Sequence, residues 1–296
     1  MTNSSVLASF HDVSFSWLDP ETGAPYALAD GNPSPPVFDG FTADIPTGFI
    51  SLVGPNGAGK STFLLLAGSR VLPTRGTVSL LGEDTRTLAG GAIGGLPGTG
   101  LNPEVAHRRN LLCSFIYQNM ELEPAEDGAR VAALLDIVYG RGGHVRKDEG
   151  FMRDVVAAFE LEGLRDRRLD ALSKGESQRV LLGFAALYGS RAIMMDEPVF
   201  AMENRQKERA LEFFRDVFRS SGVSIMVSLH ELALTRKYAD TVMLFYPDRR
   251  IDLGSVDEVL TSEALEAAYG VPPAMLYDVE RLQRRVIEEG AAGSGA

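Results

Sequence analysis

The chain has 296 residues, which is long enough for one large domain or two modest ones that bury full cores. Hydrophobic residues make up 45% of it and charged residues 23%, so a largely disordered or collagen-like chain is excluded. Its 29 basic residues are outnumbered by 40 acidic ones, and the net charge of −11 disfavours a broad nucleic-acid-binding face. Cys113 is the single cysteine, so no disulfide can form within the chain.

Signals for a membrane span or for secretion are missing from the sequence. No run approaches about 18 consecutive apolar residues, which a membrane-spanning helix would need. Residues 1–6 lack the basic region and the long apolar segment of a secretory signal. We therefore expect a protein of the cytoplasm, and any membrane-spanning part of its system would belong to other chains.

The first third of the chain predicts strands before a single short helix. Residues 7–18 alternate loosely between apolar and polar types, which predicts a strand. Residues 19–36 are rich in proline, glycine and aspartate and predict a long surface loop, followed by a second strand over 38–45. The apolar run 49–53 then ends at a glycine cluster, and residues 62–67 follow it with a helical pattern.

The middle of the chain is mostly helical in pattern. Residues 88–100 are rich in glycine and lack a regular pattern, so they are our candidate for a mobile insertion, with an ordinary solvated linker as the alternative. From 124 to 187 apolar residues recur at three- and four-residue spacing, which predicts helices, with a polar loop over 140–150. The small residues at 290–296 predict a frayed tail.

Four short apolar runs in the second half predict strands, and helical patterns separate the first three. Strands that alternate with helices favour an α/β fold with a parallel sheet covered on both faces. The runs are residues 192–195, 223–228, 241–246 and 250–253.

The segment after the run 49–53 fits G-x-x-x-x-G-K-[ST], a pattern typical of a phosphate-binding loop. Glycines let the backbone curl until several N–H groups point at a triphosphate, and the following helix directs its positive end at the same anion. Lys60 supplies a charge for the β- and γ-phosphates, and the Ser61 hydroxyl can ligate Mg²⁺. The predicted loop consists of Gly54, Pro55, Asn56, Gly57, Ala58, Gly59, Lys60, Ser61 and Thr62.

Two carboxylates, Asp196 and Glu197, end the apolar run 192–195. Because nucleotides bind at the carboxyl ends of parallel strands, we expect both carboxylates near the phosphate loop. Asp196 would hold Mg²⁺ directly or through water, and Glu197 would act as a general base toward water. Taken alone, this pattern is more typical of a strand that ends at the surface.

Three further segments have both a structural and a functional interpretation. Ser173 and Glu176 stand at capping-box spacing around Gly175, which is typical of any helix start. Gln118 follows a short apolar segment, where it can contact a metal ion or water, although a surface position is the ordinary interpretation. His230 closely follows another apolar run, and a histidine there is more often structural than catalytic.

Together these segments resemble the nucleotide-binding subunit of ABC transporters, over roughly residues 7–271. Their order matches the family: phosphate loop, glutamine loop at Gln118, signature segment 172–176, acidic strand and switch histidine at His230. The resemblance implies a P-loop NTPase fold of ABC type, with a parallel-sheet core, an N-terminal antiparallel β part and a helical subdomain at about 119–187. It also implies one ATPase domain over residues 1–275, followed by a C-terminal helix and flexible tail over 276–296.

The resemblance further implies that two copies of the chain form a head-to-tail dimer around two ATP molecules. Ser173 and Gly175 would contact the γ-phosphate bound by the opposite copy, and His230 would contact the γ-phosphate and organise the attacking water. Gln118 would sense Mg²⁺ and couple to the membrane subunits. Trp17 matches the aromatic position that stacks on adenine, with a core or interface tryptophan as the alternative. The implied catalytic residues are Glu197, His230 and Lys60, and the implied Mg²⁺ contacts are Ser61, Gln118 and Asp196.

Two departures from the family pattern stand out. Lys174 and Glu176 replace the common glycine and glutamine of the signature, and we expect Lys174 to project outward. Residues Met202 and Glu203 replace the usual leucine and aspartate of the turn after Glu197. Glu203 is one methylene longer than aspartate, which puts the geometry of dimer communication and the turnover rate in question.

Residues 254–271 resemble the end of cassettes that serve importers of iron–siderophore complexes, haem, cobalamin or metal ions. We therefore expect an ATPase subunit of such an importer at the cytoplasmic face of the membrane, with permease subunits and no nucleic acid as partners. One alternative is a cytosolic ABC ATPase outside transport, although such proteins usually carry two cassettes or a long coiled-coil insertion. The other is a nucleotide-sensing module that dimerises on ATP but hydrolyses it poorly.

Overall fold

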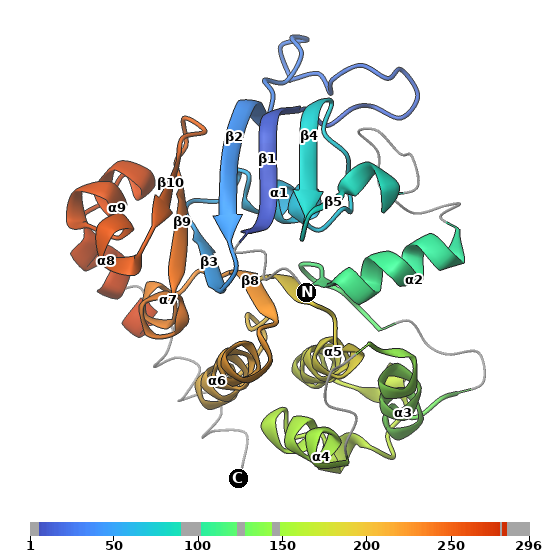
Figure 1. The fold of residues 1–296 in the computed structure, drawn as a ribbon. Helices are drawn as coiled ribbons and strands as arrows, with labels where there is room; N and C mark the ends of the chain where they lie inside the picture. The colour runs from blue at the N-terminus through green and yellow to red at the C-terminus, as the bar shows by residue number, and fades with distance from the viewer. Residues whose placement is uncertain (1–5, 90–101, 123–127, 144–148, 279, 283–296) are drawn as a thin grey trace.

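The computed structural model describes residues 6–89, 102–122, 128–143, 149–278 and 280–282. Within these residues, a six-stranded sheet has the order β10-β9-β3-β8-β7-β6, and a four-stranded antiparallel sheet has the order β2-β1-β4-β5 (Figure 1). The larger sheet comprises β3 (Phe49–Val53), β6 (Cys113–Ile116), β7 (Ala192–Asp196), β8 (Ser224–Ser228), β9 (Thr241–Phe245) and β10 (Ile251–Gly254). The smaller sheet comprises β1 (Val6–Phe15), β2 (Phe38–Pro46), β4 (Arg75–Leu80) and β5 (Glu83–Asp84).

The larger sheet is parallel except at β10, as the alternation of apolar runs and helices predicts. Successive side chains on β7 point to opposite faces: Met194 packs with α1 (Lys60–Ala67), whereas Ile193 and Met195 pack on the side of α5 (Lys174–Tyr188) and α6 (Asn204–Ser221). Because helices cover both faces, every residue of β7 is buried, which explains its unbroken apolar run.

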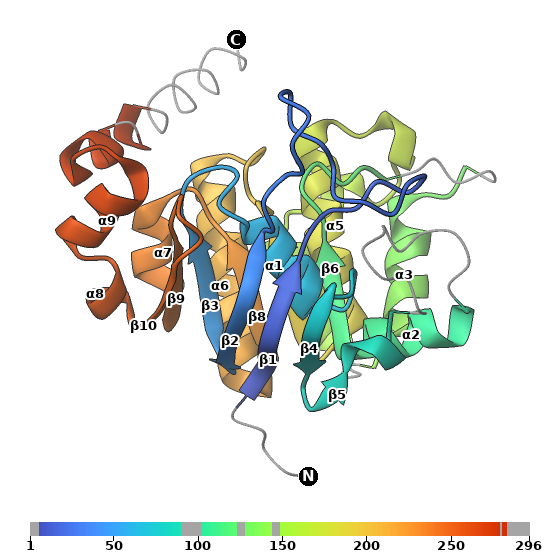
Figure 2. The same cartoon turned by 90° about the horizontal axis from the view of Figure 1, so that it is seen from above.

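Helix α1 lies between the two sheets (Figure 2). Phe63 on α1 stacks on Phe10 of β1 with ring centroids 4.7 Å apart, and it forms a T-shaped contact with Phe245 of β9, with ring centroids 5.7 Å apart. This aromatic contact joins the antiparallel sheet to the helix that follows the predicted phosphate loop, so the position of that helix is fixed from both sides.

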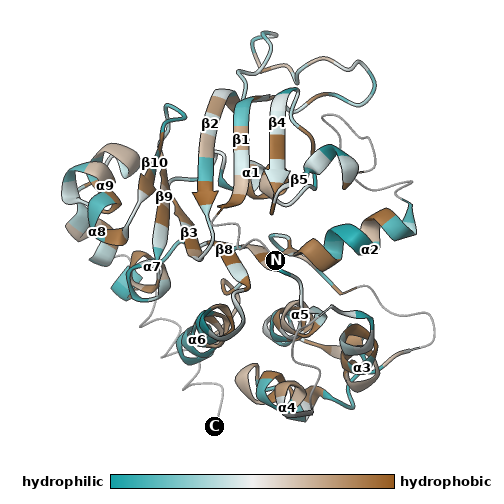
Figure 3. Ribbon diagram, in the orientation of Figure 1, coloured by the Kyte–Doolittle hydropathy of each residue, from teal (hydrophilic) through white to brown (hydrophobic). Residues whose placement is uncertain are grey.

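A helical unit packs beside β6 and β7. It comprises α3 (Val131–Arg141), α4 (Glu149–Ala158) and α5, and α2 (Pro103–Leu112) leads into β6. Gly183 of α5 faces Leu161, and a Cβ at Gly183 would lie 2.8 Å from a Leu161 methyl carbon, so a larger residue there would require the Leu161 side chain to shift. Helix α6 is amphipathic: Lys207, Ala210, Leu211 and Phe214 are buried on one stripe, and hydrophilic residues show along its outer side in Figure 3.

The chain continues from β8 through α7 (Leu232–Tyr238), β9 and β10 to α8 (Val256–Val259) and α9 (Ser262–Tyr269). These last helices form a third apolar cluster with β9 and with Val53 and Leu232, the residues that adjoin two of the predicted site segments. Residues 273–278 and 280–282 are also helical, and the rest of the predicted tail lies outside the described residues. Among the helices described, none is both long and apolar enough to cross a bilayer.

Several boundaries differ from the sequence-based expectation. The strand predicted over 7–18 ends at Phe15, and the short helix begins at Lys60 instead of residue 62. Leu88 and Ala89 are buried at the end of a 3-10 turn and so belong to the folded core, whereas residues 90–100 of the predicted insertion lie outside the described residues. Three elements were not predicted: β4, which pairs with the distant β1, β5, which has only two residues, and α2, of which only Leu112 is buried.

Candidate functional site

The predicted phosphate loop leaves β3 through a backbone conformation that requires glycine. Gly54 has a φ of +138°, and a Cβ there would overlap the carbonyl oxygen of Phe245 on the neighbouring strand β9. Gly59 has a φ of +106° and caps α1 without a side-chain hydrogen bond, and the first turn contains no acidic residue. The N–H groups at the start of α1 therefore suit an anion.

Lys60 is folded back onto its own loop. Its Nζ donates hydrogen bonds to the carbonyl oxygens of Gly54, at 2.7 Å, and Pro55, at 3.0 Å. Burial lowers the pKa of Lys60, while the negative charges of Glu197 and Asp196 act in the opposite direction. The lysine charge predicted for phosphate binding thus lies within the electrostatic reach of the predicted base Glu197 and of the predicted Mg²⁺ contact Asp196.

Two residues from the last third of the chain hold this loop, and neither was recognised from the sequence. The Gly54 N–H donates to the phenolic oxygen of Tyr269 at 2.9 Å, and burial raises the pKa of Tyr269 to about 12. Arg249 donates to the carbonyl oxygen of Gly57 at 2.8 Å. No local sequence signal marks these contacts, because they join segments about 200 positions apart in the chain.

Asp196 and Glu197 lie where β7 ends, beside the end of β8. Asp196 pairs with Ser228 in the register of these strands, and the Ser228 Oγ donates to Asp196 Oδ1 at 2.6 Å. The same Oγ accepts the Glu197 N–H at 2.9 Å. Ser228 is fully buried and was not predicted as a site residue, although its place at the end of an apolar run near His230 was a usable signal.

Glu197 adopts a left-handed backbone conformation with a φ of +50°. Such a conformation costs a residue with a Cβ about 1–2 kcal/mol. The side chain of Glu197 is mostly buried, and its Oε1 lies 2.5 Å from the Nε2 of the half-exposed His230. The strained turn thus brings together the predicted general base and the predicted switch histidine.

A buried ion pair holds the segment that follows His230. Lys207 on α6 donates to Glu231 at 2.7 Å, and the two side chains are 7% and 15% exposed. Glu231 is the residue before α7, so the pair fixes the loop between β8 and α7 to α6. This contact was not predicted from the sequence, because Lys207 and Glu231 meet only in the tertiary fold.

Gln118 and Trp17 are the two predicted site residues outside the loop, the acidic strand, the histidine and the signature segment. Gln118 is exposed two residues beyond Ile116, which pairs with Met195 in the sheet, so Gln118 follows the strand next to Asp196. Trp17 is half-buried, meets Phe15 edge-on and donates from Nε1 to the Thr62 hydroxyl at 3.3 Å. Trp17 therefore lies beside the start of α1, and Gln118 follows the strand that pairs with β7.

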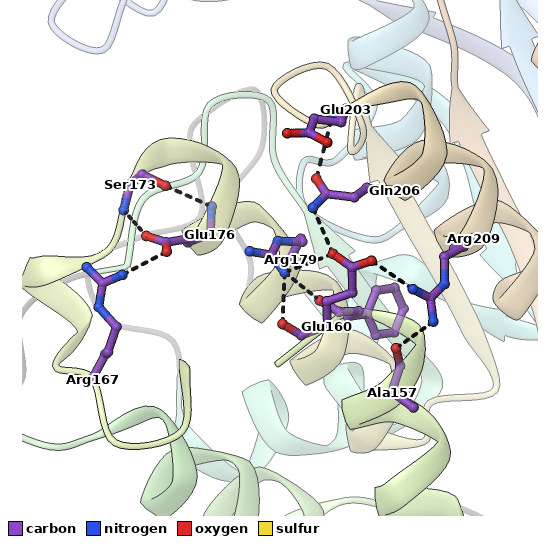
Figure 4. Close-up of polar contacts among 10 residues, drawn as sticks. Ala157, Glu160, Arg167, Ser173, Glu176, Arg179, Glu203, Gln206 and Arg209 are labelled. Carbon is purple, nitrogen blue, oxygen red and sulfur yellow. Dashed lines mark hydrogen bonds and ion pairs between the residues drawn. The ribbon is translucent and has the colours of Figure 1, made fainter. Parts of the chain in front are cut away.

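Ser173 and Gly175 begin α5 on the helical unit, as the capping-box spacing predicts. Glu176 accepts the Ser173 N–H at 2.7 Å, donates its own N–H to the Ser173 Oγ and pairs with Arg167 at 2.7 Å (Figure 4). The Ser173 N–H is the largest cause that lowers the pKa of Glu176. Glu176, one of the two departures in the signature segment, therefore orders the helix start.

Lys174, the other departure, does not simply project outward. Its Nζ donates to the Asn119 side chain at 3.1 Å, so the helix start touches the residue after Gln118. A Cβ at Gly175 would lie 2.9 Å from the carbonyl oxygen of Ala201, in the turn that follows Glu197. A glycine is needed there, because α5 and that turn approach each other closely.

The predicted loop, glutamine, carboxylates and histidine thus follow the carboxyl ends of the adjacent strands β3, β6, β7 and β8. Nucleotide sites of parallel α/β sheets are formed at this edge. In the part of the chain that the structure describes, no group of three or more histidine, cysteine, aspartate or glutamate side chains forms a metal cage. The donor set fits Mg²⁺, which binds through one or two protein oxygens together with substrate phosphates.

Comparison with known proteins gives a consistent result. A family model described as ABC transporter matches residues 39–200. The hemin import ATP-binding protein of Streptomyces coelicolor is 31% identical over 80% of this chain and 79% of its own length. The cobalamin import ATP-binding protein of Halobacterium salinarum is 29% identical over 82% of this chain, which spans only 57% of that longer protein.

The fold is also that of solved ABC cassettes. The dimeric structure of a bacterial ABC transporter cassette superimposes with a TM-score of 0.64, at 17% identity over 84% of this chain and 99% of the other. At that identity the likeness concerns the fold. The family match covers more than half of the sequence and includes the phosphate loop and the acidic strand. The resemblance seen in the sequence is confirmed: the chain belongs to the ABC transporter family and is an ATP-binding cassette ATPase.

Proposed function

We propose that this chain binds MgATP at the edge of its parallel sheet and that hydrolysis there drives an importer of an iron chelate, haem, cobalamin or metal ion. One observation carries the assignment of the site. The buried Lys60 follows the end of β3, Asp196 and Glu197 lie at the end of β7, which only β8 separates from β3, and Glu197 lies 2.5 Å from His230.

The phosphate loop binds the triphosphate. Its backbone N–H groups and the start of α1 surround the phosphates, and Lys60 exchanges its bonds to Gly54 and Pro55 for phosphate oxygens. Ser61, Asp196 and Gln118 would hold Mg²⁺, which neutralises negative charge on the β- and γ-phosphates when bound. Trp17 offers its ring to the adenine from beside Thr62.

Glu197 accepts a proton from the water that attacks the γ-phosphorus. Ser228 holds the Glu197 backbone and Asp196 together, so the base and the Mg²⁺ contact keep a fixed separation. His230 contacts Glu197 directly and orients the base toward the γ-phosphate. In a second copy of the chain, Ser173 and Gly175 complete the site from the opposite side, with Glu176 and Arg167 ordering the helix start.

The membrane partners follow from the proposed import function. Permease subunits would hold the dimer at the cytoplasmic face of the membrane, and Gln118 and Asn119 lie on an exposed segment that can transmit nucleotide binding to them. Two relatives are named as import ATP-binding proteins, one for hemin and one for cobalamin. If the chain purifies from a detergent extract together with multi-span membrane subunits, the import function is supported. Co-purification with ribosomes or DNA would instead favour a function outside transport.

The test of the catalytic assignment is Glu197→Gln. This variant should bind ATP with wild-type affinity in a fluorescent-nucleotide assay and lose steady-state hydrolysis, because only the proton acceptor is removed. Lys60→Ala should instead lose ATP binding. If Glu197→Gln keeps its turnover, Glu197 is not the base. If the wild type pairs on ATP but shows no turnover with its permease present, the chain is a nucleotide-sensing module.

A further inference from the structure

Glu160 occupies a backbone position that ordinarily suits glycine. It follows the end of α4 with a φ of +54°. The Glu160 N–H donates to the carbonyl oxygen of Ala157, and the Leu161 N–H donates to that of Val156. These two bonds form a Schellman motif, in which the left-handed residue is most often glycine. A glutamate at this point strains the backbone, so the role of its side chain needs an explanation.

The carboxylate of Glu160 joins three helices (Figure 4). Gln206 on α6 donates to it at 2.9 Å, and Arg209 on the same helix donates at 2.7 Å. Arg179 on α5 lies 3.6 Å from it and also donates to the carbonyl oxygens of Phe159, at 3.2 Å, and Glu160, at 2.8 Å. The Arg179 side chain is 12% exposed and that of Glu160 is 35% exposed, so the arginine is largely buried while water reaches the carboxylate.

The contacts of Glu160 with Arg179 and with Gln206 connect it to two segments of the proposed site. Arg179 lies on α5, the helix that Ser173 caps at its N-terminus. Gln206 lies in the first turn of α6, and its Oε1 accepts the N–H of Glu203, the residue that closes the turn after Glu197. The same turn meets the start of α5 at Gly175 and Ala201. Glu160 is thus linked through Gln206 to Glu203, which closes this turn, and through Arg179 to the helix that Ser173 caps.

We propose that Glu160 is a positioning residue that fixes the start of α5 relative to the turn between Glu197 and α6. This inference rests on the proposed function, in which Ser173 completes the site of a second copy and Glu197 is the base. The cluster contains no residue of the phosphate loop. Removal of the carboxylate should therefore lower the turnover of the paired chains and leave nucleotide binding by each separate chain unchanged.

Two variants separate this role from simple helix termination. Glu160→Gln keeps the size of the side chain and removes its charge. Glu160→Gly also removes the carboxylate but relieves the backbone strain, so it should be the more stable of the two. We expect both to lower kcat about fivefold or more while the KM for ATP stays within about twofold of wild type. The control is Glu208→Gln, which breaks the exposed pair between α6 and Lys237 and should leave kcat unchanged.

Full wild-type activity in Glu160→Gly would overturn the proposal, because the glutamate would then only end a helix. Hydrogen exchange of the same full-length variants gives a readout that is independent of catalysis. Both variants should speed amide exchange at 173–176 and at 203–206 together, whereas faster exchange confined to 159–161 would also overturn the proposal. If the wild type has no turnover, or if Glu197→Gln keeps it, the proposed function fails, and the exchange pattern still decides whether Glu160 couples α5 to the turn.

Discussion

The hydroxyl of Ser228 joins the two carboxylate residues of the site, because it donates to Asp196 Oδ1 at 2.6 Å and accepts the backbone N–H of Glu197 at 2.9 Å. Ser228 ends β8, and Asp196, its partner in the ladder, ends β7. A single buried oxygen therefore holds one carboxylate directly and supports the left-handed backbone of the other. The distance between the proposed Mg²⁺ contact and the proposed base depends on it.

Ser228→Ala should lower kcat by on the order of tenfold, because supporting partners of metal-binding side chains typically matter to this extent. It should also destabilise the fold by about 1–3 kcal/mol, since Asp196 and the Glu197 N–H both lose a buried partner. ATP turnover and urea unfolding measure the two effects. Ser224→Ala is the matched control: Ser224 begins the same strand, and its buried Oγ is unpartnered among the described residues, so no loss is expected. If Ser228→Ala and Ser224→Ala change ATP turnover and stability equally, Ser228 does not support the two carboxylate residues as the structure indicates.

Tyr269→Phe should weaken nucleotide binding without slowing the chemical step. The change deletes only the oxygen that accepts the Gly54 N–H, which leaves the first residue of the phosphate loop less restrained. We expect the KM for ATP to rise about three- to tenfold with kcat nearly constant, as measured by steady-state kinetics. Tyr277→Phe is the control, because its hydroxyl bonds the Arg236 side chain, away from the loop. A fall in kcat alone would argue against this role.

Lys207→Met should destabilise the protein strongly, because it leaves the Glu231 carboxylate without its ammonium partner in a largely buried position. Breaking one side of such a pair typically costs about 3–5 kcal/mol. In the double variant Lys207→Met, Glu231→Gln, part of that stability should return, since no unpaired charge remains. Chemical unfolding of both variants measures the difference. If the double variant is less stable than the single one by the full additive amount, the pair does not interact as the structure indicates.

The contacts of Glu160 predict an acid-dependent part of the stability. The hydrogen bond from Gln206, followed by the charges of Arg179 and Arg209, lowers the pKa of Glu160 below its ordinary value of 4.5. A lowered pKa in the folded state means that the contribution is complete above about pH 4.5 and is lost as the pH falls through the folded-state value. The difference in the free energy of unfolding between wild type and Glu160→Gln should therefore be constant near neutral pH and shrink in acid. A difference that stays constant down to pH 3 would contradict this account.

The sequence was informative wherever the chemistry is local. The phosphate loop needs its glycines and Lys60 within nine consecutive positions, and the capping box needs Ser173 and Glu176 three apart. Short apolar runs located β3, β7, β8 and β9 closely, since strands buried on both faces carry few polar residues. The strand β4 was missed because its main partner β1 is distant in the chain, whereas β5 is only two residues long and α2 buries only Leu112, so neither has a clear apolar pattern.

By itself, the sequence determined the family, the order of the site segments and the residues that carry charge. Only the tertiary structure decided which distant residues support them: Ser228 under Asp196, Tyr269 on Gly54, and Glu160 between α5 and α6. Each of these contacts joins positions that are far apart along the chain, and its partners are brought within hydrogen-bond distance only by strand register and helix packing. A side chain that acts at such a distance has no periodic or motif signature, because what selects it is geometry in space.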